Sequence, residues 1–209
     1  MQIMIITYLG RQFVKIEQGK MVMAFNPISK QSKGGAGAKF GADIAFVTTN
    51  HPDYNGLEQL SFGERTPFAI TGPGDYEVKD IFIKGVLSHT LIAGKKYINT
   101  IYIFSVDNIK IVFLGALSFK ENEQLSKEAR EAINNPDILF IPVTEVKEAA
   151  KLASSLEPKM IIPMDYDSAS LKAFLKESGE EKAATVEKLT LKSKDLDGKE
   201  GEVVVLKAT

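Results

Sequence analysis

The chain has 209 residues, of which 44% are hydrophobic and 25% are charged, a composition typical of a globular protein with a sizeable buried core. Its net charge of −1 gives no reason to expect binding to nucleic acid or to a membrane surface, and no apolar run approaches the roughly 18 residues of a membrane span. The chain has no cysteine, which excludes disulfides, thiolate zinc sites, iron–sulfur clusters and a cysteine nucleophile.

The first half of the chain is predicted to consist mainly of β-strands. Its N-terminal residues lack the basic segment and the cleavage site of a signal peptide, so we expect a cytoplasmic protein. Residues 27–40 are rich in Gly, Ser and Lys; they predict a flexible surface loop without core anchors and lack the GxxxxGK[ST] spacing of a phosphate-binding loop. Asp107-Asn108 predicts a tight hairpin turn. The predicted strands are residues 3–9, 13–16, 21–25, 43–48, 68–71, 81–86, 99–106 and 109–114.

Helices are predicted in the second half, at residues 118–134, 144–156 and 168–178. Ser118 and Glu121 have the spacing of a capping box, and Gly179 follows the third helix as a C-terminal cap. Further strands are predicted at 137–141, 160–163, 186–191 and 203–206. The order of the elements, with strands in the first half and helices in the second, predicts a single domain, residues 1–209, in which helices cover β-sheets.

The chain has only two histidines, His51 and His89, so any metal site must rely on carboxylates. His51 and Asp53 lie in the polar segment 48–56 directly after a predicted strand. Taken alone, a His-x-Asp pair is more typical of a hydrogen-bonded turn than of a metal site.

Two other polar segments could carry chemistry. Residues 72–78 contain Asp75 and Glu77, but turn formation with surface carboxylates is the simpler interpretation. In residues 161–167, Asp165 or Asp167 could either face a site or cap the helix that begins near residue 168.

Nine segments, distributed through nearly the whole chain, carry a resemblance to a known family. They are residues 8–10, 13–16, 26–27, 48–56, 72–78, 99–102, 113–115, 141–143 and 156–166. In this order they resemble the metallo-β-lactamase-fold hydrolases, in particular a small bacterial branch described as Zn-dependent hydrolases. The resemblance implies an α/β (α+β) fold, an αββα sandwich of two mixed β-sheets flanked by helices, with the active centre at one edge.

The resemblance also places the family's metal-binding motif on this chain. Its central His-x-His-x-Asp-His falls on Thr49, His51, Asp53 and Tyr54, so the first and last histidines are missing. The family's third-strand histidine falls on His89.

Three more motif positions differ from the family pattern. Ala116 stands where the bridging aspartate is expected, Asp165 replaces the closing histidine, and Asn26 replaces an early aspartate. A dinuclear hydrolytic site needs ligands on both metals and an anionic bridge, so that bound water loses a proton near neutral pH. Ala116 removes both a ligand and a negative charge.

We therefore expect a member of this fold without efficient metal-dependent hydrolysis or a cofactor, which has a binding or regulatory role toward a small molecule or a protein. The alternative is a hydrolase of lactones or phosphoesters that uses one zinc or manganese ion held by His51, Asp53, His89 and Asp165, with Asp53 as the catalytic base. A third hypothesis is a homo-oligomeric scaffold that associates through exposed strand edges or the Gly-rich loop.

Overall fold

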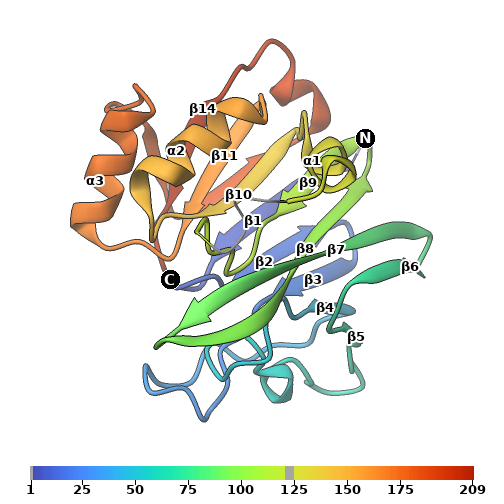
Figure 1. Ribbon diagram of the computed structural model, residues 1–209. Helices are drawn as coiled ribbons and strands as arrows, with labels where there is room; N and C mark the ends of the chain where they lie inside the picture. Colours follow the sequence, from blue (N-terminus) through green and yellow to red (C-terminus); the bar gives the residue numbers. More distant parts are fainter. Residues whose placement is uncertain (1, 121–124) are drawn as a thin grey trace.

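Two β-sheets face each other across a shared apolar core, and helices lie on the outer face of one of them (Figure 1). The computed structural model describes residues 2–120 and 125–209. Both sheets are mixed, which confirms the sandwich expected from the sequence. None of the helices in the described residues combines the length and the apolar character that a membrane crossing requires.

The first sheet has six strands in the order β13-β1-β2-β3-β4-β5. Neighbours are antiparallel from β13 to β3 and parallel from β3 to β5. The strands are β1 (Met4–Tyr8), β2 (Val14–Gln18), β3 (Met21–Phe25), β4 (Ile44–Phe46), β5 (Phe68–Ile70) and β13 (Lys188–Leu191).

The second sheet has eight strands in the order β12-β14-β11-β10-β9-β8-β7-β6. It is parallel from β12 to β9 and antiparallel from β9 to β6. The strands are β6 (Gly74–Val78), β7 (Ile81–Ile92), β8 (Lys95–Val106), β9 (Ile109–Phe113), β10 (Ile138–Pro142), β11 (Met160–Met164), β12 (Ala184–Val186) and β14 (Glu202–Leu206).

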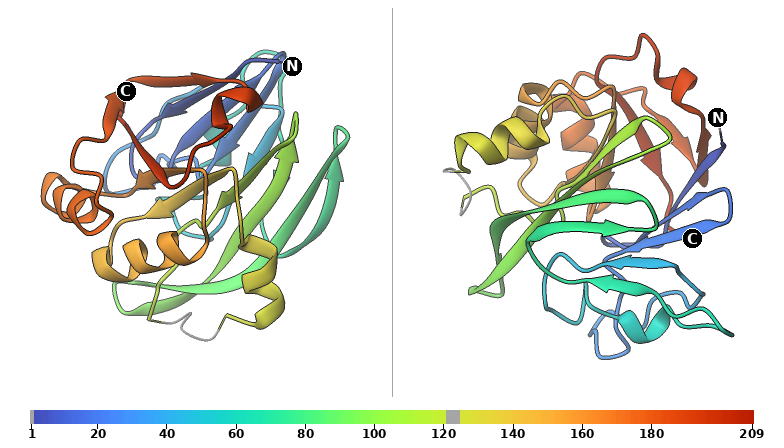
Figure 2. Two further views of the ribbon diagram at one scale, coloured as in Figure 1. Left: turned by 90° about the horizontal axis from the view of Figure 1, so that it is seen from above. Right: turned by 90° about the vertical axis from the view of Figure 1, so that its right-hand side faces the viewer.

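The helices cover the second sheet on the side away from the first sheet (Figure 2). They are α1 (Lys127–Ile133), α2 (Val146–Ser155) and α3 (Ser168–Glu177), and two short 3-10 helices span Leu57–Gln59 and Ser193–Leu196. β10 is buried on both faces: Ile138 and Phe140 pack between the sheets, whereas Leu139 and Ile141 pack under the helices. Its uninterrupted apolar sequence is what such a doubly covered strand requires.

Phenylalanine rings join the two sheets at the centre of the sandwich. The ring of Phe25 stacks on Phe46 of its own sheet at a centroid distance of 4.3 Å. It also stacks on Phe113 at 4.8 Å and Phe104 at 5.6 Å, which belong to the opposite sheet. These aromatic contacts fix how the two sheets face each other and therefore where their edge loops meet.

The outer face of the first sheet carries a loop. Residues 27–40 form no helix or strand, as predicted, but the prediction that they lack core anchors is wrong. Ile28 is buried against Phe13 and Ala24, and Phe40 stacks on Phe13 at 5.7 Å. Two apolar residues at the ends of the segment are enough to hold the loop against the sheet.

Two short predicted elements differ from the structure. Residues 72–78 were predicted as turns, but Gly74–Val78 forms the edge strand β6, because its backbone pairs with β7. Residues 186–191 were predicted as one strand, but the chain divides there between two sheets: β12 pairs with β14 and β13 pairs with β1. Backbone pairing with distant segments decides both cases.

The first predicted helix begins later than expected. Phe119 and Lys120 lie in a turn, Glu121 lies outside the described residues, and α1 starts at Lys127. Ser126 caps α1, because its side chain accepts a hydrogen bond from the backbone N–H of Ala129. A serine caps the helix as predicted, but it is Ser126 and not Ser118.

Other local predictions are confirmed. Asp107 and Asn108 have φ values of 52° and 64°, as a two-residue hairpin turn requires. Asp167 caps α3 and forms a capping box with Ser170, and Gly179 follows that helix with a φ of 72°.

Candidate functional site

The motif positions meet at one edge of the sandwich, where loops leave several strands. The loops after β4, β9, β10 and β11 and the loop between β1 and β2 surround a cleft of about 420 Å³ beside the end of β7. Arg11, Asp53, Tyr54, Ala116 and Asp165 line this cleft. Thus residues from four loops, far apart in the sequence, share one small space.

Asp53 is already engaged by side chains of the protein. The Arg11 guanidinium forms an ion pair with Asp53, with Nη1 2.8 Å from Oδ2. The hydroxyl of Ser32 donates a hydrogen bond to the other carboxylate oxygen. His51 belongs to the same turn, since its Nδ1 accepts the backbone N–H of Asp53 at 3.3 Å. The Asp53 carboxylate therefore has a cation and a hydroxyl donor from its own chain.

Asp165 has neutral partners instead. Its Oδ2 accepts hydrogen bonds from the Tyr54 hydroxyl and from Gln12 Nε2, both at 3.2 Å. Burial, followed by the negative charge of Asp165, raises the pKa of Tyr54 above its ordinary value. Tyr54 is consequently a neutral donor to Asp165.

A single asparagine ties together two of the altered motif positions. Asn99 Oδ1 accepts hydrogen bonds from the Thr49 hydroxyl at 3.2 Å and from the backbone N–H of Ala116 at 2.9 Å. Its Nδ2 donates to Ser88 Oγ at 2.8 Å and to the carbonyl of Leu114 at 2.9 Å. Asn99 is fully buried, and all of its side-chain hydrogen-bonding capacity is used within the protein.

Asn26 forms a second buried polar cluster beside the first. Its Nδ2 donates to Gln12 Oε1 at 3.0 Å and to Thr48 Oγ1 at 2.9 Å, while its Oδ1 accepts the backbone N–H of Thr48 at 2.9 Å. Its backbone has a φ of 46°, a conformation that asparagine tolerates better than most residues. The residue at this motif position therefore holds the loop after β4 instead of pointing at the cleft with a carboxylate.

His89 is not brought together with the other candidate ligands. The neighbouring Thr90 lines the cleft, and successive side chains of a strand point to opposite faces. Thr90 pairs with Tyr97, whose ring contacts His51 edge-on at 5.7 Å. His89 pairs with the exposed Ile98 on the other face. Within the described residues, no three His, Cys, Asp or Glu side chains form a group that could hold a metal ion.

These residues do not fit the metal centre that the resemblance implies. Both carboxylates accept hydrogen bonds from protein donors, and a guanidinium already pairs with one of them. Thr49, Tyr54 and Ala116 offer an alcohol, a neutral phenol and a methyl group, which are poor ligands for zinc, and the two histidines lie on opposite faces of the paired strands.

The altered positions were identified from the sequence, but the roles of Arg11, Gln12 and Ser32 were missed, because single residues of these types carry no motif. Asn99 belongs to the matched segment 99–102, but its hydrogen bonds to distant residues have no local signal.

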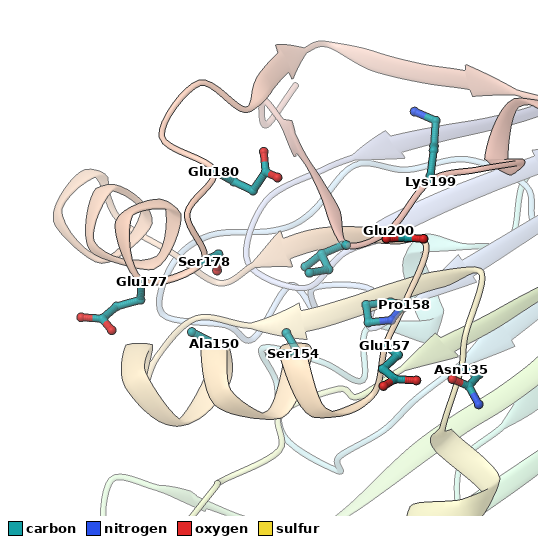
Figure 3. Close-up of a pocket in the computed structure, with 13 residues that line it drawn as sticks. Asn135, Ala150, Ser154, Glu157, Pro158, Glu177, Ser178, Glu180, Lys199 and Glu200 are labelled. Atoms are coloured by element: carbon teal, nitrogen blue, oxygen red, sulfur yellow. The ribbon is translucent and has the colours of Figure 1, made fainter.

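A larger cleft of about 620 Å³ lies elsewhere, between α2, α3 and the segment before β14 (Figure 3). Glu157, Glu177, Glu180 and Glu200 line it, but Figure 3 shows the carboxylates of Glu177 and Glu180 pointing away from each other. None of the motif residues lines this cleft.

Solved structures of several proteins have a similar fold. A candidate Zn-dependent hydrolase of the metallo-beta-lactamase superfamily from Thermotoga maritima is 27% identical, with a TM-score of 0.74 over 97% of this chain and 98% of that one. A candidate metal-dependent hydrolase from Parabacteroides distasonis is 19% identical, with a TM-score of 0.63 over 85% and 90% of the two chains. Igni18, a metallo hydrolase from Ignicoccus hospitalis, is 17% identical, with a TM-score of 0.61 over 91% and 99%.

No curated protein matches the chain significantly. The profile of the beta-lactamase superfamily domain matches residues 5–165, which include β2 to β11 and every motif position discussed above. The fold and this match agree, and the chain belongs to the beta-lactamase superfamily.

Proposed function

We propose that this protein is a metal-independent member of the superfamily that binds a small molecule in the edge cleft and does not catalyse the hydrolysis typical of the family. One observation carries the proposal: the two carboxylates at motif positions, Asp53 and Asp165, are bonded by Arg11, Ser32, Gln12 and Tyr54 of the same chain. A metal ion could reach Asp53 only by displacing Arg11 or Ser32, and Asp165 would offer it a single oxygen without a donor from the chain.

The cleft itself supports the binding role. Its volume of about 420 Å³ lies within the range of roughly 300–1,000 Å³ that is common for small-molecule sites. Ala116 contributes to this space, because a methyl group occupies the position where the family has a carboxylate. Polar side chains and apolar residues such as Leu117 both line the cleft, as expected for a site that orients a ligand.

The metal content of the tag-free protein tests the proposal. Elemental analysis before and after incubation with excess zinc or manganese, followed by gel filtration, is expected to find no stoichiometric metal. Assays with lactones and phosphoesters are expected to find no turnover above background. We expect His51→Ala and His89→Ala to change neither result.

The alternative hypothesis, a hydrolase with one metal ion, predicts bound metal and turnover. About one zinc or manganese ion per chain, lost together with turnover in His51→Ala, would overturn the proposal. The metal content of Arg11→Met is a sharper test, because this variant removes the cation that pairs with Asp53. Lys15→Met is its control, because it removes a cation that pairs with Glu17 instead. The scaffold hypothesis stays a separate prediction, and a monomer in light scattering across concentrations would contradict it.

A further inference from the structure

The cleft contains a carboxylate without a cationic partner. Asp165 uses Oδ2 for Tyr54 and Gln12, both neutral, and no described residue donates a hydrogen bond to its Oδ1 or forms an ion pair with it. Oδ1 is not fully buried, and Asp165 lines the cleft, so this oxygen is accessible from the cleft. A partly buried carboxylate in this position favours a positive charge nearby.

Thr90 presents a second unused polar group to the same space. The residue is only 4% exposed and lines the cleft, yet its hydroxyl has no hydrogen-bond partner among the described residues. Its oxygen is not fully buried either. A buried threonine whose hydroxyl opens into a cavity can accept a hydrogen bond from a ligand there.

The other lining residues define the rest of the ligand. Ala116, Leu117 and Ile92 give the cleft an apolar wall. Three acidic and two basic residues line the cleft. Because Arg11 is paired with Asp53, two acids and one base remain, and this excess of negative charge favours a cation. A divalent metal ion would need more oxygen ligands than one free carboxylate oxygen and one hydroxyl can provide.

We propose that the edge cleft binds a small organic cation, a primary ammonium group on a short apolar chain. The ammonium group donates to Asp165 Oδ1 and to the Thr90 hydroxyl, and the apolar chain lies against Ala116 and Leu117. This inference rests on the proposed function, since it names the class of molecule that the metal-free cleft accepts.

Titrations of the full chain with n-butylammonium chloride, 1-butanol and sodium butyrate, followed by backbone amide NMR shifts, test this charge preference. We expect butylammonium to shift the amides of Thr90, Ala116 and Asp165. We expect it to bind about ten-fold more tightly than 1-butanol, a difference of about 1.4 kcal/mol that one charge-assisted hydrogen bond can provide. Butyrate is expected to bind more weakly than both.

Two near-isosteric variants locate the ammonium group. Asp165→Asn removes the charge but keeps an oxygen for Tyr54 and Gln12, and asparagine tolerates the φ of 52° at this position. It is expected to weaken butylammonium binding about ten-fold, and Thr90→Val about three-fold. Asp75→Asn, on the exposed edge strand β6, is the matched control and is expected to leave binding unchanged.

Equal binding of butylammonium and 1-butanol, unchanged binding by Asp165→Asn, or shifts confined to other parts of the chain would each overturn this inference. A parallel titration with zinc chloride distinguishes this failure from failure of the proposed function. Zinc binding that shifts the backbone amide signal of His51 would overturn the proposed function. If neither zinc nor butylammonium binds, only the inference about the ligand fails.

Discussion

At the scale of single residues, the site depends on buried polar groups that satisfy one another. Asn99 joins the loop after β4 to the loop after β9, since Thr49 and Ala116 both donate to its Oδ1. A buried donor or acceptor that loses its partner costs more than an average hydrogen bond contributes. The hydrogen bonds of Asn99 therefore hold these two loops together.

Asn99→Ala is expected to lower the free energy of unfolding by about 3 kcal/mol, because it leaves the Leu114 carbonyl and the Ala116 N–H without partners in a buried region. Urea unfolding measures the change. Asn50→Ala removes an exposed asparagine from the adjoining loop and is expected to cost less than about 0.5 kcal/mol. Equal effects of the two variants would show that Asn99 is not a structural centre of the site.

At the scale of elements, a carboxylate at the start of β4 links three segments of the chain. Asp43 Oδ2 accepts the backbone N–H of Val22 in β3 at 2.8 Å, and Oδ1 accepts from Lys79 Nζ, between β6 and β7, at 3.1 Å. Burial opposes ionisation of Asp43, but the hydrogen bond from Val22 and the Lys79 ammonium outweigh it and lower the pKa of this carboxyl. Asp43 therefore contributes more to stability when it is ionised than when it is protonated.

A lowered folded-state pKa contributes stability above the unfolded pKa of about 4, and this contribution is lost as the pH falls through the folded-state value. Asp43→Asn is expected to lower the free energy of unfolding by about 1.5 kcal/mol at pH 7. The difference from the parent protein is expected to shrink below about pH 4, as urea unfolding at several pH values would show. A difference that stays constant with pH would contradict the role of the charge, and Asp75→Asn is the control.

The sequence predicted elements best where their signals are local. The hairpin turn at Asp107 and Asn108 and the cap of α3 at Asp167 were correct, because each depends on neighbouring backbone. The division of residues 186–191 between β12 and β13 was missed, because β14 and β1 compete for this segment from distant parts of the chain. Pairing between distant strands has no local sequence pattern.

At the scale of the whole molecule, the aromatic stack couples the two sheets. Phe25 and Phe46 of the first sheet pack on Phe104 and Phe113 of the second, so neither sheet can bury its inner face without the other. The single domain over residues 1–209 stays a prediction, and cooperative unfolding tests it.

Phe25→Ala is expected to lower the free energy of unfolding by about 4 kcal/mol and to shift the whole transition, because it leaves a cavity between the sheets. The chain has no tryptophan, so tyrosine fluorescence and far-ultraviolet circular dichroism are the two probes. Their urea transitions are expected to coincide in both proteins. Separate transitions would contradict a single domain, and Phe82→Ala, at a side chain that is 71% exposed, is the control.

The sequence alone determined the superfamily fold, through the resemblance of nine segments to a known family, and the residue that stands at each motif position. Apolar periodicity and turns determined the local elements, since these depend on neighbouring residues. Only the tertiary structure decided how the remaining carboxylates are satisfied. Arg11 is 42 residues from Asp53, and Gln12 is 153 residues from Asp165. The packing of two sheets brings these pairs within hydrogen-bonding distance, and it leaves Asp165 and Thr90 with unused polar atoms in one cleft.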